Sequence, residues 1–172
     1  SHSITKRLKR RKNQSASFKR FASREEFNNW VDNAYVLMGK AYFYQRNFAS
    51  AIENFSYVTR KFADDPSRYT AYIWLIRSYT ELERSVEAFE IIQQMQDDED
   101  FPRQLDGQLA TVTADYYAKQ LSYAEGIPFL SIAVKQTAKK ADKIRYKFVL
   151  AQWYKETGNP EKSSQIFREI SR

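Results

Sequence analysis

The chain has 172 residues, of which 42% are hydrophobic, and this is enough to bury one core of domain size. Glycine and proline number four each, whereas phenylalanine and tyrosine number twelve each, a composition that favours packed helices over a turn-rich β fold. The absence of cysteine excludes disulfides and thiolate metal sites, and no apolar run is long enough for a membrane-spanning helix. We therefore expect one all-α domain.

The first predicted segment is a basic arm, residues 1–24. It holds nine Lys and Arg and neither Asp nor Glu, whereas the rest of the chain, with 19 basic against 21 acidic residues, carries a net charge of −2. The opening Ser1-His2-Ser3 resembles a cloning remnant, and we expect the arm to be partly disordered. Aromatic residues from Phe18 to Trp30 then predict a capping helix over the apolar end of the domain that follows.

Residues 25–172 contain an internal repeat. Four stretches close on a tyrosine eight positions after their start: Ala34–Tyr42, Ala71–Tyr79, Leu109–Tyr117 and Tyr146–Tyr154. Successive copies are offset by 37, 38 and 37 residues. Gly39, Ala114 and Ala151 place a small residue where two helices must approach closely. Each copy is followed by a second amphipathic stretch, so we expect four antiparallel helix pairs.

Turn and cap signals separate the repeats. Asp64–Ser67 is typical of a helix stop followed by a new cap, and Gly158-Asn159-Pro160 predicts a tight turn with proline at a first helical position. The acidic run Asp97–Asp100 lacks the alternating spacing of a calcium loop, so we interpret it as a solvated connection. The repeats are expected at about 32–68, 69–106, 107–143 and 144–172.

This pattern resembles the tetratricopeptide repeat (TPR), a helix-turn-helix unit of 34 residues. The first copy matches its pattern through Tyr35, Gly39, Tyr42, Ala51 and Phe55. The resemblance implies an all-α, TPR-like right-handed superhelix, an α-solenoid of about four repeats with an N-terminal capping helix. Such a superhelix is a scaffold for protein binding.

Three longer strings resemble one particular family: Asn29–Tyr44, Tyr72–Tyr79 and Asp142–Gln152. They are similar to the TPR lipoproteins of the Bacteroidota that serve gliding motility and type IX secretion, the SprE/PorW family. The resemblance implies an adaptor in the cell envelope, on the periplasmic face of the outer membrane, that contacts a secretion or motility machine. That family is anchored through an acylated Cys, so this chain is expected to begin after the anchor. A cytoplasmic location stays open.

In this repeat class the first helix of each pair lines the concave groove of the superhelix, and the resemblance therefore places a protein-binding site there. Aromatic side chains beside Lys40 and Arg77 would cradle a peptide, because aromatic and arginine anchors carry most interface energy. The alternative is that Phe43 and Tyr44 pack on the N-terminal cap. The exposed groove positions are expected to be Asn33, Val36, Lys40, Phe43, Tyr44, Ile73, Arg77, Thr111, Asp115, Phe148 and Gln152.

No catalytic constellation is present in the sequence. The single histidine is His2, and the four glycines are isolated rather than gathered in a phosphate-binding loop. We therefore predict no enzyme activity, no cofactor and no metal, and a protein as the partner; the oligomeric state stays open. The alternative is binding of an anionic surface or a nucleic acid through the basic arm, since its cations would release counterions from a polyanion. Nucleic acid is the less favoured partner.

Overall fold

The structure, a computed structural model, describes residues 30–171. Residues 30–44 are helical. The helices that follow are α2 (Phe48–Lys61), α3 (Ser67–Glu81), α4 (Ser85–Asp97), the short 3-10 helix η1 (Arg103–Leu105), α5 (Asp106–Lys119), α6 (Tyr123–Gln136), α7 (Lys140–Glu156) and α8 (Pro160–Ile170). Residues 30–171 contain no strand. The basic arm and most of the predicted capping helix lie outside the described residues.

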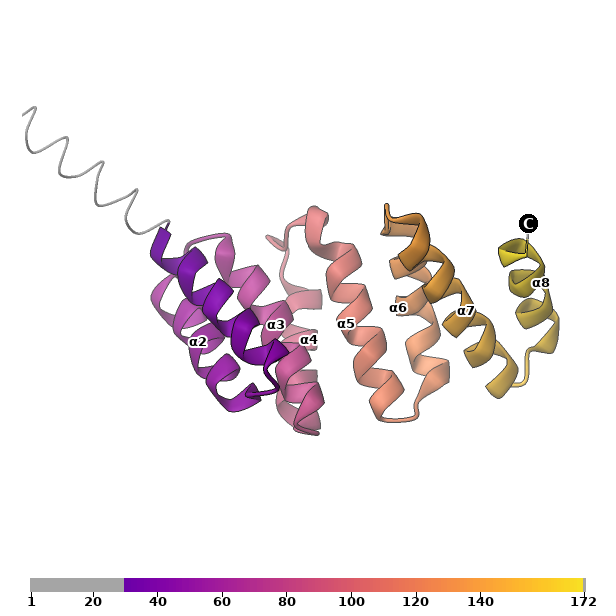
Figure 1. The fold of residues 1–172 in the computed structure, drawn as a ribbon, viewed down its shortest axis with the longest axis horizontal. Helices are drawn as coiled ribbons and strands as arrows, with labels where there is room; N and C mark the ends of the chain where they lie inside the picture. Colours follow the sequence, from indigo (N-terminus) through magenta and orange to yellow (C-terminus); the bar gives the residue numbers. More distant parts are fainter. Residues whose placement is uncertain (1–29, 172) are drawn as a thin grey trace, which may run out of the picture.

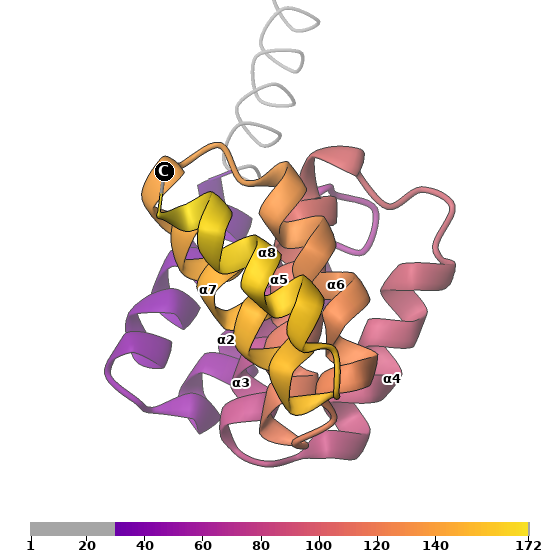
Figure 2. The same ribbon diagram turned by 90° about the vertical axis from the view of Figure 1, so that its right-hand side faces the viewer.

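The helices form antiparallel pairs that stack along one axis (Figure 1). Each helix contacts only its near neighbours: α3 packs on α2, α4 and α5, α6 packs on α5 and α7, and α8 packs on α7. Viewed from the α8 end, the earlier pairs lie behind α8 (Figure 2). The predicted all-α solenoid is therefore confirmed.

The turn inside each pair has the same backbone geometry in all four repeats. One residue adopts a positive φ: Arg46 (62°), Glu83 (58°), Leu121 (56°) and Gly158 (80°). The next amide donates to the carbonyl of the tyrosine that closes the repeat pattern: Asn47 to Tyr42, Arg84 to Tyr79, Ser122 to Tyr117, and Asn159 to Tyr154. This 6→1 bond after a left-handed residue is the Schellman motif. The spacing of the sequence repeats is therefore also the spacing between successive helix ends of this type.

The small residue of the repeat sets how closely the helices approach. A Cβ at Gly39 would lie 2.5 Å from Cε1 of Phe55, a ring that is itself fully buried. Ala114 and Ala151 occupy the same repeat position and are also buried. Gly126 of α6 meets Trp153 of α7 in a similar way, since a Cβ there would lie 2.8 Å from Cζ3 of the indole. These close approaches let three successive hydrophobic clusters form along the stack.

Candidate protein-binding face

One row of side chains runs across the first helices of the repeats. Lys40, Arg77, Asp115 and Gln152 occupy the same repeat position, on helix 30–44, α3, α5 and α7. Arg77 acts electrostatically on both Lys40 and Asp115, and in the neighbouring row Nζ of Lys119 lies 3.5 Å from Oε2 of Glu81. The first helices therefore share one surface, which we call the inner face. Helix 30–44, α5 and α7 lie toward the viewer in Figure 1.

Trp74 is the centre of an aromatic cluster on this face. The Phe43 ring meets the indole edge to face at 5.3 Å, and the Tyr44 ring does so at 5.8 Å. The guanidinium of Arg77 lies 4.7 Å from the indole centroid, and Nζ of Lys40 lies 5.3 Å from it. We call these five residues the Trp74 cluster. The predicted neighbourhood of Lys40, Phe43, Tyr44 and Arg77 is therefore present.

The sequence did not indicate Trp74 as a site residue. It follows Tyr72 within the repeat pattern, where an apolar residue is expected to serve the core, and it is indeed only 8% exposed. Two cations nevertheless lie over its ring. The available signal was the spacing, because Trp74 and Arg77 are three residues apart on one helix and so share a side of it.

Among the described residues, neither cation of the Trp74 cluster has a carboxylate within ion-pair distance. The ion pairs among the described residues are Arg84–Glu87, Lys119–Glu81, Arg145–Asp142 and Lys147–Glu169, and neither Lys40 nor Arg77 takes part in one. Partial burial lowers the pKa of Lys40 below its ordinary value, and the positive charge of Arg77 lowers it further. The inner face thus carries two positive charges without an ion-pair partner at this point, with the Asp115 carboxylate further along the row.

A cleft of about 330 Å³ adjoins the Trp74 cluster. Ile73, Trp74 and Arg77 form its α3 wall, Gln108 and Thr111 its α5 wall, and Tyr146 of α7 also borders it. Its lining mixes amide, hydroxyl and aromatic groups, so it suits a side chain that is partly polar. The hydroxyl of Thr111 already donates to the carbonyl of Gly107 at 2.8 Å, so the oxygen keeps accepting capacity.

Asp115 lies beyond Arg77 on the same row. Its side chain reaches solvent, yet the surrounding inner face removes much of its hydration, and this burial raises the pKa of the carboxyl. The positive charges of Arg77 and Arg145 oppose the rise, and the net direction is upward because burial is the larger effect.

Two predicted groove residues, Val36 and Ile73, are buried rather than exposed. Val36 is 5% exposed and belongs to the cluster around Phe55, because it is three residues before the tightly packed Gly39 and so faces the same way. Ile73 is 2% exposed because α3 is covered by α2, α4 and α5. Ile73 still forms part of the cleft wall.

The remaining predicted residues lie at several places. Asn33 is exposed on helix 30–44. Phe148 is 48% exposed and meets Phe167 of α8 edge to face at 5.5 Å, while Gln152 borders a separate hollow that also includes Phe167. The structure therefore does not bring Phe148 and Gln152 to the Trp74 cluster. Phe43 and Tyr44 pack on Trp74, and Phe43 also packs on Phe48.

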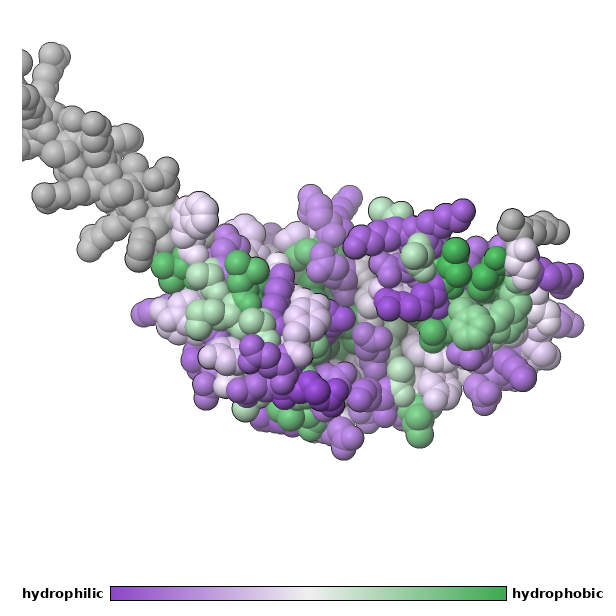
Figure 3. Space-filling model, in the orientation of Figure 1, coloured by the Kyte–Doolittle hydropathy of each residue, from purple (hydrophilic) through white to green (hydrophobic). Residues whose placement is uncertain are grey.

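Figure 3 shows how this surface is divided. Apolar side chains gather over helix 30–44 at one end and over α7 and α8 at the other, with mainly hydrophilic surface between them. Leu37 and Met38 are 65% and 46% exposed at the first end, and Ile144 and Phe148 are 41% and 48% exposed at the second. The charged row thus lies between two apolar regions.

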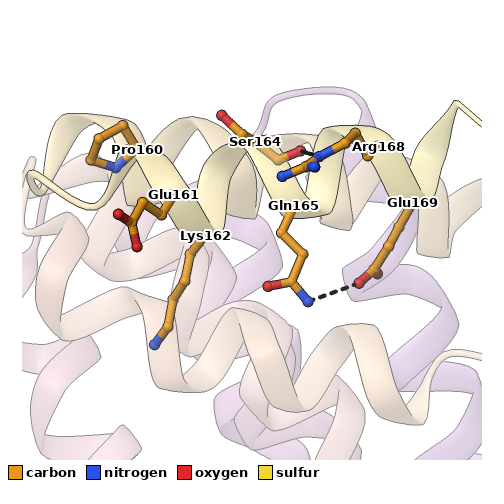
Figure 4. A pocket seen from close by; sticks show the side chains of 7 residues that line it. All are labelled: Pro160, Glu161, Lys162, Ser164, Gln165, Arg168 and Glu169. Carbon is orange, nitrogen blue, oxygen red and sulfur yellow. Dashed lines mark hydrogen bonds between the residues drawn. The ribbon is translucent and has the colours of Figure 1, made fainter.

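A hollow on the surface of α8 is an unsuitable binding site. It measures about 840 Å³, but all seven lining residues belong to α8. Figure 4 shows these side chains extending from that single helix, with Gln165 donating to Glu169 at 3.5 Å. A surface with one wall cannot enclose a ligand. In the described part of the chain no group of three or more His, Asp or Glu could hold a metal ion, and no helix is long and apolar enough to cross a membrane.

Stacked helix pairs with a shared inner face define a TPR-like solenoid. The solved structure "MamA RS-1 ArsTM double mutant", of a TPR-like protein, matches with a TM-score of 0.63 over 81% of this chain and 73% of that chain. The sequence identity is 14%, so the likeness shows the fold alone. No protein-family model and no curated protein matches the sequence.

Proposed function

We propose that the chain is a non-enzymatic adaptor that holds a peptide segment of a partner protein on its inner face. The observation that carries this proposal is the Trp74 cluster, where the 74% exposed Tyr44 packs on Trp74 and two cations lie over the same indole. Aromatic and arginine side chains dominate binding energy at protein interfaces, and here they adjoin a cleft of side-chain size.

The biological setting follows from the resemblance to the SprE/PorW lipoproteins. We propose that the chain is a segment of a cell-envelope TPR lipoprotein that serves type IX secretion or gliding motility in the Bacteroidota. The partner would then be a component of that machinery at the periplasmic face of the outer membrane. The strings Asn29–Tyr44 and Asp142–Gln152 support this setting.

Site-specific photocrosslinking tests which face binds. A benzoylphenylalanine at Tyr44, on the inner face, is compared with one at Gln165, on the outward side of α8, in the full chain mixed with a Bacteroidota envelope extract. We expect a discrete adduct with an envelope-machinery protein from position 44 and none from position 165. Adducts from position 165 alone would overturn the inner face as the site, and adducts with unrelated proteins would overturn the secretion setting.

The basic arm gives the second candidate function, because residues 1–24 concentrate nine positive charges. Arm-driven binding to a nucleic acid or an anionic membrane should weaken steeply between about 50 and 200 mM salt, as counterion release requires. Binding through the inner face involves two cations, Lys40 and Arg77, instead of the nine of the arm, so it should weaken much less steeply over that range. Binding of a single-stranded oligonucleotide and of anionic vesicles at both salt concentrations separates the two functions.

A further inference from the structure

We propose that Lys40 and Arg77 together form a receptor for a carboxylate, so that the inner face selects an acidic peptide segment. This inference rests on the proposed function, since it names the chemistry of the segment that the adaptor would hold. The carboxylate is expected to sit between the ammonium and the guanidinium, above the indole of Trp74.

The first argument is the missing counter-charge. Arg84, Lys119, Arg145 and Lys147 each have a carboxylate within ion-pair distance, whereas the two cations over Trp74 have none among residues 30–171. Lys40 and Arg77 instead repel each other, and the pKa of Lys40 is lowered first by its partial burial and second by this repulsion. A bound carboxylate would relieve both the repulsion and the lost hydration.

The second argument is that the two cations are held in place before any ligand arrives. The guanidinium of Arg77 lies 4.7 Å from the indole centroid and 5.8 Å from the Phe43 centroid, and Nζ of Lys40 lies 5.3 Å from the indole centroid, so cation–π contacts restrain both groups. A guanidinium in a fixed plane can donate two parallel hydrogen bonds to a carboxylate. Less side-chain entropy is lost on binding when the donors are ordered in advance.

The third argument concerns what flanks the receptor. The exposed ring of Tyr44 offers an apolar surface on one side, and the cleft bordered by Thr111 and Tyr146 opens on the other. An acidic residue at the receptor would therefore place an apolar neighbour on Tyr44 and a partly polar neighbour in the cleft. An extended peptide provides this alternation of side chains.

A polyphosphate chain fits this surface poorly. Glu81 and Asp115 follow Arg77 across the inner face, so a ligand with evenly spaced negative charges would meet carboxylates within one repeat of the receptor. A peptide avoids this repulsion because its acidic side chain is local. The inner face thus favours an acidic polypeptide over a nucleic acid.

The test is selection from a random twelve-residue peptide library displayed on phage, using the full chain. The variants are Lys40→Glu with Arg77→Glu, and the milder Lys40→Gln with Arg77→Gln. The matched control, Arg103→Glu with Lys135→Glu, makes the same charge change at exposed positions away from the receptor. Far-UV circular dichroism checks that each variant keeps its helices.

We expect the parent chain and the control to enrich peptides with Asp or Glu beside an aromatic residue. The charge reversals should replace that preference with Lys or Arg, and the neutral pair should weaken a selected acidic peptide by about tenfold or more, the change that one charge-assisted hydrogen bond supports. Replacing the acidic residue of that peptide with its amide, Asp with Asn or Glu with Gln, should weaken the binding by the same factor.

Two outcomes overturn the inference while leaving the adaptor function intact: enriched peptides without an acidic preference, or an acidic preference that survives both variants. Selection of no peptide by the folded parent chain counts against the adaptor function itself and, with it, the receptor. Binding of a twenty-nucleotide oligothymidine that the charge reversals abolish, without any acidic peptide, assigns the site to phosphate and also overturns the inference.

Discussion

The ring of Phe55 occupies the space that a side chain at residue 39 would need. We predict that Gly39→Leu lowers the free energy of unfolding by about 1 to 3 kcal/mol, because the buried ring has no room to move aside. Urea unfolding followed by circular dichroism measures the change. Gly107→Leu is the matched control, since its Cβ would meet only the exposed Gln136 side chain, and a loss at residue 107 as large as at residue 39 would contradict the prediction.

Asp115 makes stability depend on pH. Its pKa in the folded chain is raised above the ordinary value of 3.8, so ionisation favours the unfolded chain and stability falls as the pH rises through and above that value. We therefore predict that Asp115→Asn raises the free energy of unfolding at pH 7 relative to the parent chain, and that the difference shrinks toward pH 3.

Paired urea titrations at pH 3 and pH 7 measure this difference directly. Asp106→Asn, at the half-buried start of α5, controls for the loss of any one carboxylate. If Asp115→Asn were less stable than the parent at pH 7, the attraction of Arg77 and Arg145 would exceed the effect of burial, and the predicted direction would be wrong.

The repeat offset alone accounts for much of the candidate site. Lys40 and Arg77 are 37 residues apart, one repeat, so the sequence could place them on neighbouring helices of one face. It could not show that Val36 and Ile73 are buried, because the four residues of that position differ in exposure: Val36 and Ile73 are buried, Thr111 is half-buried and Phe148 is exposed. Burial depends on which neighbours cover each helix, and a repeat pattern does not contain that information.

At the level of elements, the turns within the four helix pairs have the same backbone geometry although their residues differ. Arg46, Glu83 and Leu121 adopt the left-handed conformation that Gly158 adopts without penalty. The sequence predicted the fourth turn from its Gly-Asn-Pro string, whereas the other three lack a glycine signal. They form because the closing tyrosine carbonyl accepts a hydrogen bond in every repeat, which fixes the helix end.

A reciprocal substitution tests this account. Leu121→Gly should raise the free energy of unfolding and Gly158→Leu should lower it, each by about 1 kcal/mol, because a Cβ is strained at positive φ. Steric contacts do not obscure the second change, since nothing lies within 4 Å of a Cβ at residue 158. Thermal unfolding of both variants measures the changes, and shifts of equal sign would refute the shared geometry.

At the scale of the whole molecule, stability is a sum over neighbouring helices. The main contacts of α8 are with α7, and those of α7 are with α6 and α8. A change in the last helix pair should therefore affect the stability of α3 only through the helices that lie between them. We predict that Ala151→Phe, which overfills a fully buried position, opens the last pair and leaves the cluster around Ile76 protected.

Amide hydrogen exchange measures the protection of each residue in the Ala151→Phe variant. Exchange in α7 and α8 should accelerate while exchange in α3 stays slow. A matched change on the surface, Glu156→Gln, should alter neither region. Uniform acceleration across α3 and α8 would show that the solenoid unfolds as a single cooperative unit.

The four Schellman turns also bear on how the chain is made. Each turn is closed by a hydrogen bond that spans five residues, so a helix pair needs no distant partner to begin forming. Chains dominated by such short-range contacts fold quickly, and synthesis delivers the repeats one after another. Each completed pair can therefore serve as a template for the next one as it leaves the ribosome.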